Sequence, residues 1–126
     1  MPIRWTISHA ERLVTVKADG DVTRKDLEAY LDALIAGDAM SYAKLFDASD
    51  VRPSYDDHDM MMLGARMRAY ASMFEGGPLV FVANSEPVRE AIARYLNLAA
   101  AHRPSAVFET ADQAHAWLDK QRATKS

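Results

Sequence analysis

The run LVFVA at positions 79–83 constrains the fold more than any other stretch of this sequence. It holds no polar side chain, it is too short for a helix, and it is rich in β-branched and aromatic residues. This pattern is typical of a strand that is buried on both faces, as in parallel sheets packed between helices. We therefore expect an α/β fold, in which the rest of the chain supplies the neighbouring strands and the covering helices.

The N-terminal part of the chain predicts an antiparallel hairpin. Hydrophobic and polar side chains alternate over residues 3–8, and a second alternating run covers residues 13–18. Alternation with a period of two is the pattern of a strand with one buried face. A short connection between two such strands favours antiparallel pairing. The residues at 19–21 should end the second strand.

Apolar stripes at helical spacing predict helices along the rest of the chain. The first helix covers residues 24–36; Thr23 and Asp26 can form its capping box, and Gly37 suits the C′ position. The second helix covers about 57–74 by the same periodicity. A third begins after Asn84 or Ser85, and the last follows a capping box at Thr110.

The predicted elements follow the order β-β-α-β-α-β-α-β-α. This order indicates a single α/β domain with four helices and a mixed, mostly parallel sheet of about five strands that starts with the antiparallel hairpin. A chain of 126 residues is long enough to bury one core. We expect the domain to cover residues 1–121 and the polar residues 122–126 to form a frayed tail.

Composition and charge argue against several classes of protein. The chain has no cysteine, which excludes disulfides and thiolate chemistry. Its net charge of −3 provides no basic face for nucleic acid. The first residues lack the apolar run of a signal peptide, and no stretch reaches the roughly 18 apolar residues of a spanning helix. We therefore expect a cytoplasmic protein with no transmembrane segment and no nucleic-acid partner.

Polar residues gather between the third strand, expected at 43–46, and the second helix. The end of a buried strand that leads into a helix N-terminus is a usual place for a site in an α/β domain. The simplest role for the acidic residues here is to cap the helix, since Asp accepts hydrogen bonds from the first free N–H groups. The candidate interaction residues are Asp47, Ser49, Ser54, Tyr55, Asp56, Asp57 and His58.

No catalytic or metal-binding motif accompanies these residues. The acidic run at 56–59 contains His58, but neighbouring residues of a helix point in different directions and do not converge on a metal ion. Ser49 and Ser54 lie near His58 in sequence, yet neither lies in a nucleophile elbow and nothing indicates an oxyanion hole. We expect no enzyme activity, no metal site and no cofactor.

The second helix begins with three consecutive methionines, Met60, Met61 and Met62, which cover more than one side of a helix. The simpler interpretation is that Met60 and Met61 fill the core while Met62 is exposed. The alternative is an apolar surface or cavity for a protein partner, a second copy of the chain or a small apolar ligand. The candidate apolar contact residues are Met60, Met61, Met62, Met67 and Phe74.

Several segments are similar to segments of one family. LFDASDV at 45–51 is similar to a strand with the pattern apolar-apolar-Asp-x-Ser-x-Val, and VFVAN at 80–84 with the following PVR at 87–89 resembles the next strand and helix start. VFET at 107–110 and the helix up to 118 resemble the C-terminal end of that family. On these segments the chain resembles the STAS domain, the SpoIIAA-like (anti-sigma-factor-antagonist) family, which implies the fold described above.

The same resemblance sets expectations for function. In signalling members, a partner kinase phosphorylates a serine at the start of the second helix. The matching place here falls at Asp56, Asp57 and His58, where no hydroxyl is present. The resemblance thus implies a non-catalytic regulatory or protein-interaction module without the serine switch, whose carboxylates could mimic a phosphoserine. The alternative that it implies is a carrier or sensor of a small apolar or lipid-like ligand, including one that acts at a membrane surface.

Overall fold

The computed structural model describes residues 2–52, 56–74, 76–99 and 103–123. The helices and strands follow the predicted order. They are β1 (Ile3–Ser8), β2 (Leu13–Gly20), α1 (Arg24–Ala36), β3 (Ala43–Val51), α2 (Asp57–Ala71), β4 (Leu79–Val82), α3 (Glu86–Ala99), β5 (Ser105–Phe108) and α4 (Ala111–Ala123).

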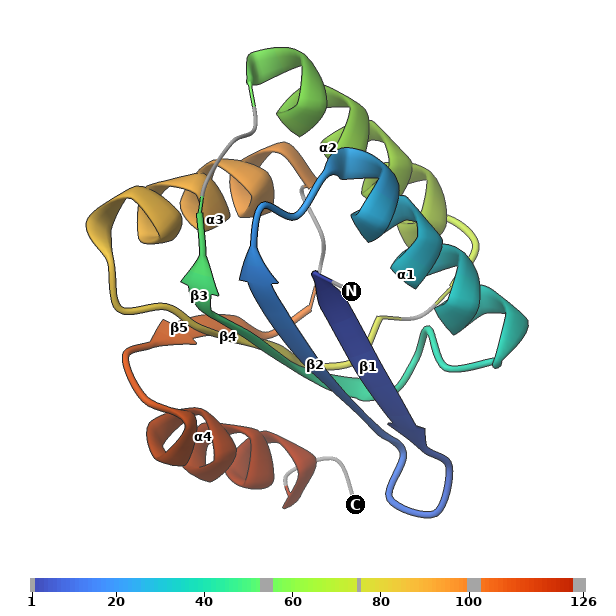
Figure 1. Cartoon of the computed structure of the whole chain (residues 1–126). Helices are drawn as coiled ribbons and strands as arrows, with labels where there is room; N and C mark the ends of the chain where they lie inside the picture. The colour runs from blue at the N-terminus through green and yellow to red at the C-terminus, as the bar shows by residue number, and fades with distance from the viewer. Residues whose placement is uncertain (1, 53–55, 75, 100–102, 124–126) are drawn as a thin grey trace.

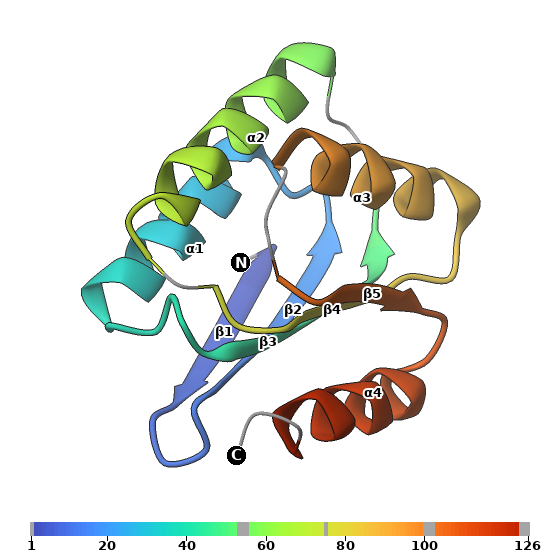
Figure 2. The same ribbon diagram turned by 180° about the vertical axis from the view of Figure 1, so that it is seen from behind.

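The strands form one 5-stranded sheet in the order β1-β2-β3-β4-β5. β1 is antiparallel to β2, and the other neighbours are parallel, as the predicted mixed sheet requires. Helices α1, α2 and α3 lie on one face of the sheet, and α4 covers the other face (Figures 1 and 2). The predicted single α/β domain is confirmed.

The LVFVA segment forms the buried strand β4, and its side chains divide between the two layers. Val80 and Val82 pack with Ala114 and Leu118 of α4. Phe81 faces the opposite side, where it packs with residues of α3. Both faces are therefore covered, which explains the absence of polar side chains in this run.

Local capping fixes the bounds of α1. The backbone N–H of Asp26 donates to Thr23 Oγ1 at 3.1 Å, and the Thr23 N–H donates to the Asp26 carboxylate at 2.9 Å. At the other end of α1, Gly37 was expected at the C′ position, where the backbone is usually left-handed. Its φ of −88° is not left-handed. Asp38 takes that place with φ 54°, and Asp is one of the few residues that tolerate it.

The structure corrects the expected end of β3. The strand continues beyond Phe46 to Val51, so Asp47 and Ser49 lie in a strand and not in a loop. β3 extends this far because β2 continues beside it. The register between the two strands is irregular between Lys17 and Asp19, and beyond this point Gly20 pairs with Val51. A polar strand end of this kind depends on its neighbour and gives no apolar signal in the sequence.

Two helix ends also differ from the expectation. α2 ends at Ala71, where the Ser72 hydroxyl donates to the carbonyl oxygen of Ala69 at 2.7 Å, and Phe74 lies in the turn that follows. Side-chain bonds of this type compete with the helical pattern. α4 continues to Ala123, beyond the expected domain end at 121. The tail residues 124–126 lie outside the described part of the chain.

Candidate functional site

An apolar cavity of about 120 Å³ lies between the sheet and helices α1, α2 and α3. Lys44, Phe46 and Ala48 of β3 line it, because alternate residues of this strand face the three helices. The helices contribute aliphatic and thioether side chains. The main apolar lining residues are Met40, Met60, Leu63, Met67, Phe81 and Ile92.

The lining residues of the cavity are spread along β3. Lys44, near the start of the strand, and Val51, at its end, both line the cavity. At about 3.3 Å per residue, the seven steps from Lys44 to Val51 span roughly 23 Å. The lining therefore suits a narrow, extended molecule better than a compact one.

The polar side chains in the lining are Tyr30, Lys44, Tyr95 and Arg103. Tyr30 is only 4% exposed, and its hydroxyl has no hydrogen-bond partner among the described residues. Lys44 is also 4% exposed. Its Nζ donates to the carbonyl oxygens of Met40 at 2.6 Å and Tyr42 at 2.8 Å. Such buried polar groups are costly unless they are hydrogen-bonded or paired.

Burial controls the ionisation of these groups. Burial and, to a smaller extent, the positive charge of Arg103 lower the pKa of Lys44 to about 7. Burial raises the pKa of Tyr95 to about 12, against the opposite effect of Arg103. The pKa of Tyr30 is raised still more by burial, and Arg103 acts on it as well. Arg103 thus lies within electrostatic reach of Lys44, Tyr30 and Tyr95, which line the same cavity.

The predicted apolar contact residues separate into groups. Met60 and Met67 line the cavity. Met61 and Met62 are 62% and 46% exposed, so the interpretation that Met61 fills the core is wrong. The turn of an α-helix explains this, since a side chain next to the inward-facing Met60 points about 100° away. Phe74 packs half-buried against the core, with its ring 6.3 Å from that of Tyr70, and is not among the lining residues.

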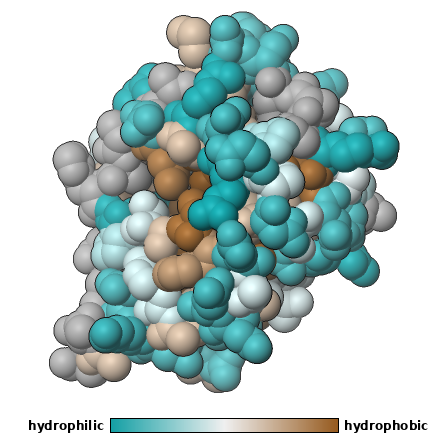
Figure 3. Space-filling model, turned by 90° about the vertical axis from the view of Figure 1, so that its left-hand side faces the viewer, coloured by the Kyte–Doolittle hydropathy of each residue, from teal (hydrophilic) through white to brown (hydrophobic). Residues whose placement is uncertain are grey.

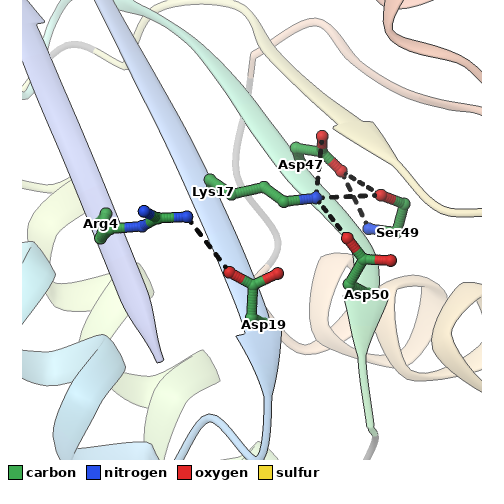
Figure 4. Close-up of polar contacts among 6 residues, drawn as sticks. All are labelled: Arg4, Lys17, Asp19, Asp47, Ser49 and Asp50. Carbon is green, nitrogen blue, oxygen red and sulfur yellow. Dashed lines mark hydrogen bonds and ion pairs between the residues drawn. The ribbon is translucent and has the colours of Figure 1, made fainter. Parts of the chain in front are cut away.

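Asp47 and Ser49 lie on the face of the sheet opposite to the cavity. They alternate with cavity-lining residues of β3 and share the side of Leu45, which packs against α4. Figure 4 shows the resulting cluster around Lys17, whose Nζ contacts the carboxylate of Asp50 at 2.7 Å and that of Asp47 at 3.4 Å. The structure thus does not bring these residues together with Met60 and Met67.

Hydrogen bonds determine the ionisation of the Asp47 carboxylate. Burial alone would raise its pKa, but the Ser49 hydroxyl at 2.6 Å, the Ser49 N–H at 3.0 Å and the charge of Lys17 outweigh burial and lower the pKa. The pKa of Lys17 is raised, mainly by its hydrogen bond to Asp50. Asp47 is therefore an ion-paired carboxylate that holds the end of β3 against β2.

The start of α2 contains the remaining predicted interaction residues. Asp56 is the N-cap, and its carboxylate accepts the N–H of Asp59 at 2.8 Å, which lowers the pKa of Asp56. The predicted capping role is thus confirmed. Asp57 forms an ion pair with Arg94 of α3, and His58 is exposed. Ser54 and Tyr55 lie outside the described residues.

Lys44 and Tyr30 are the cavity residues that sequence reasoning missed. Each stands inside an apolar pattern, Lys44 between Ala43 and Leu45 and Tyr30 in the buried stripe of α1. The signal that could have identified Lys44 is its place within a strand segment that is otherwise apolar. Among the described residues, no three His, Asp or Glu side chains are placed to hold a metal ion.

No protein-family model matches the chain, and no curated protein matches its sequence. Its structure is similar to the crystal structure of an uncharacterised protein of the DUF3478 family, with a SpoIIAA-like fold, from Shewanella loihica PV-4. The TM-score is 0.60 at 21% identity, and the match covers 92% of this chain and 93% of the other. The chain therefore has the SpoIIAA-like fold, as the resemblance implied. None of the helices in the described ranges is both long and apolar enough to cross a membrane.

On one side of the molecule, where β5 forms the edge of the sheet, Figure 3 shows a strip of hydrophobic side chains between hydrophilic ones. The β5 residues Ala106, Val107 and Phe108 are only partly buried. The apolar character of the interior thus extends to the surface at this edge. An edge strand also presents unpaired backbone groups.

Proposed function

We propose that this protein binds a small, elongated apolar ligand in the cavity between the sheet and helices α1–α3. The observation that carries the proposal is the cavity itself, about 120 Å³ of unfilled space lined mostly by apolar side chains. Protein interiors are close-packed, and voids larger than a water molecule are few. An apolar cavity of about 150 Å³ is known to stay dry and to bind benzene.

The size of the cavity limits the affinity. Each buried CH₂ group contributes about 0.8 kcal/mol, so the eight-carbon chain of 1-octanol gains roughly 6 kcal/mol. Part of this gain is lost to the ordering of the ligand. We therefore expect dissociation constants on the order of 0.1–1 mM for a simple alcohol of this length. Carriage or sensing of such a ligand requires no catalytic step.

Filling the cavity should weaken this binding. Ala48 is 4% exposed and lines the cavity, so the substitution Ala48→Leu places three additional carbons where the ligand would lie. We expect 1-octanol to bind the wild type and to bind Ala48→Leu at least about tenfold more weakly, with the melting temperature of the variant unchanged or raised. Isothermal titration calorimetry and thermal unfolding measure the two quantities.

The matched control is Ala65→Leu. Ala65 lies on the exposed side of α2 and is not among the lining residues, so this variant should bind 1-octanol like the wild type. Equal affinity of the wild type and Ala48→Leu would contradict the proposal, because the ligand would then bind elsewhere.

A second candidate function is the non-catalytic regulatory or protein-interaction module. The observation that favours it is the exposure of Met61 and Met62 beside the acidic start of α2. Exposed methionines suit adaptable apolar contacts. The carboxylate of Asp57 at the same end of the helix would add a charged contact to this surface.

Under this second candidate, a partner or a second copy of the chain binds the exposed side of α2. Met62→Glu and Asp57→Lys should then both abolish the association, because one places a charge in an apolar contact and the other reverses a charge. Sedimentation velocity over a concentration series measures this for self-association. Met73→Glu is the control, since Met73 is 67% exposed but lies beyond α2. Unchanged association of both test variants would remove this surface from consideration.

A further inference from the structure

The polar region of the cavity carries positive charge that no described lining residue balances. Lys44 and Arg103 both line the cavity, and none of the described lining residues is Asp or Glu. The topology places both cations at one end. Lys44 lies near the start of β3 and Arg103 just before β5, and parallel strands start at the same edge of a sheet.

This region also holds hydrogen-bond donors that nothing in the described chain uses. The hydroxyl of Tyr30 and the Nε of Arg103 are buried and have no partner among the described residues. A protonated lysine has three N–H donors, and Lys44 directs its Nζ to two carbonyl oxygens, those of Met40 and Tyr42. Buried donors and charges of this kind are normally matched by acceptors and opposite charges.

An anion with at least three accepting lone pairs would complete this arrangement. A carboxylate has two oxygens with about four lone-pair sites. It could accept from Lys44, from Tyr30 and from Arg103, while its hydrocarbon part lies along the apolar lining. A two-chain phospholipid is too large for about 120 Å³.

We propose that the ligand of this cavity is a medium-chain organic carboxylate, with its carboxylate at Lys44, Tyr30 and Arg103. Its acyl chain extends along Phe46 and Met60 towards Val51. The inference rests on the proposed function, since it names the class of ligand for the same cavity.

Proton linkage gives this ligand a characteristic pH dependence. The pKa of Lys44 in the unliganded protein is about 7. A bound carboxylate favours the charged ammonium, so affinity should be highest below pH 7 and fall as Lys44 loses its proton above pH 7. The other titratable groups among the described lining residues are Tyr30 of α1, Tyr95 of α3 and Arg103. α2 contributes the uncharged Met60, Leu63 and Met67.

These lining groups do not change their charge in the relevant range. The pKa of Tyr95 is raised by burial to about 12 and that of Tyr30 is raised further. Arginine stays protonated throughout. Among the described lining residues, Lys44 is therefore the group whose charge changes between pH 6.5 and pH 8.5.

The test compares octanoate with octanamide, its neutral isostere, by isothermal titration calorimetry at pH 6.5 and pH 8.5. We expect the wild type at pH 6.5 to bind octanoate about tenfold more tightly than octanamide. The affinity for octanoate should fall by about tenfold at pH 8.5, while that for octanamide stays constant. Lys44→Met should bind octanoate more weakly than the wild type and without the dependence on pH, and Tyr30→Phe should weaken octanoate more than octanamide.

Tyr30→Phe changes only one oxygen atom and keeps the inference testable if Lys44→Met does not fold. Equal binding of octanoate and octanamide by the wild type at pH 6.5 would overturn the inference and leave the proposed function intact. Binding of neither compound would overturn both. Acetate that binds as tightly as octanoate would also overturn the inference, because the acyl chain would then contribute nothing.

Discussion

Gly77→Ala should destabilise the protein by about 1–3 kcal/mol, the usual cost of forcing atoms into a packed interior. A Cβ at this position would lie 2.5 Å from the carbonyl oxygens of Ser41 and Tyr42. Both atoms belong to the backbone that leads into β3, so they cannot yield without moving the strand. The Tyr42 carbonyl also accepts the hydrogen bond from Lys44, and the substitution should therefore disturb the polar end of the cavity as well.

Urea denaturation at fixed pH measures this loss, and Gly76→Ala is the matched control. A Cβ at Gly76 would meet Cδ of Arg103 at 3.0 Å, which is part of a flexible side chain that can move. We expect Gly76→Ala to cost clearly less than Gly77→Ala. Equal unfolding free energies for the two variants would show that the close approach of Gly77 to the backbone of residues 41 and 42 is not a constraint on the fold.

The unfolding free energy of the wild type should rise with pH between about 7 and 10. The pKa of Lys44 is about 7 in the folded protein and about 10.4 in an unfolded chain. Between these values the unfolded chain holds a proton that the folded protein does not, so the contribution of Lys44 rises by up to about 1.4 kcal/mol per pH unit. Below pH 7 both states hold the proton and the contribution no longer changes.

Urea denaturation at intervals from pH 7.0 to pH 9.5 measures this slope. The range ends there because the raised pKa values of Tyr30 and Tyr95 reduce stability at higher pH, where the unfolded chain loses protons that the folded protein keeps. Lys44→Met should lack the rise. Lys17→Met should keep it, since Lys17 is partly exposed and its pKa is raised rather than lowered. The same slope in the wild type and Lys44→Met would contradict the burial of an ionisable lysine.

The parts of the fold that local patterns encode were predictable. The order of the elements and the bounds of α1 follow from hydrophobic periodicity and from the Thr23 capping box, which involve residues close in sequence. The end of β3 depends instead on pairing with β2, which is distant in sequence and passes through a register irregularity. No local pattern announces such pairing, and the segment from Asp47 to Val51 therefore resembled a loop.

The residues of the candidate site were also predictable only where a local pattern encodes them. Met60 and Met67 are candidates from helical spacing alone, and both line the cavity. Asp47 was a candidate from its place after an apolar run, yet its side chain lies on the other face of the sheet. For Lys44 the signal was limited to its place within an apolar strand, and Tyr30 gave none, because their significance arises only when three helices and the sheet enclose them.

The most direct test of ligand binding in the cavity is an NMR titration of protein labelled with ¹³C at the methionine methyl groups, with 1-octanol as the ligand. Met40, Met60 and Met67 line the cavity, whereas Met61, Met62 and Met73 are exposed. The proposal predicts saturable shifts of the methyl resonances of Met40, Met60 and Met67, with those of the exposed methionines unchanged. Shifts confined to Met61, Met62 and Met73, or no saturable shift of the cavity methionines, would contradict it.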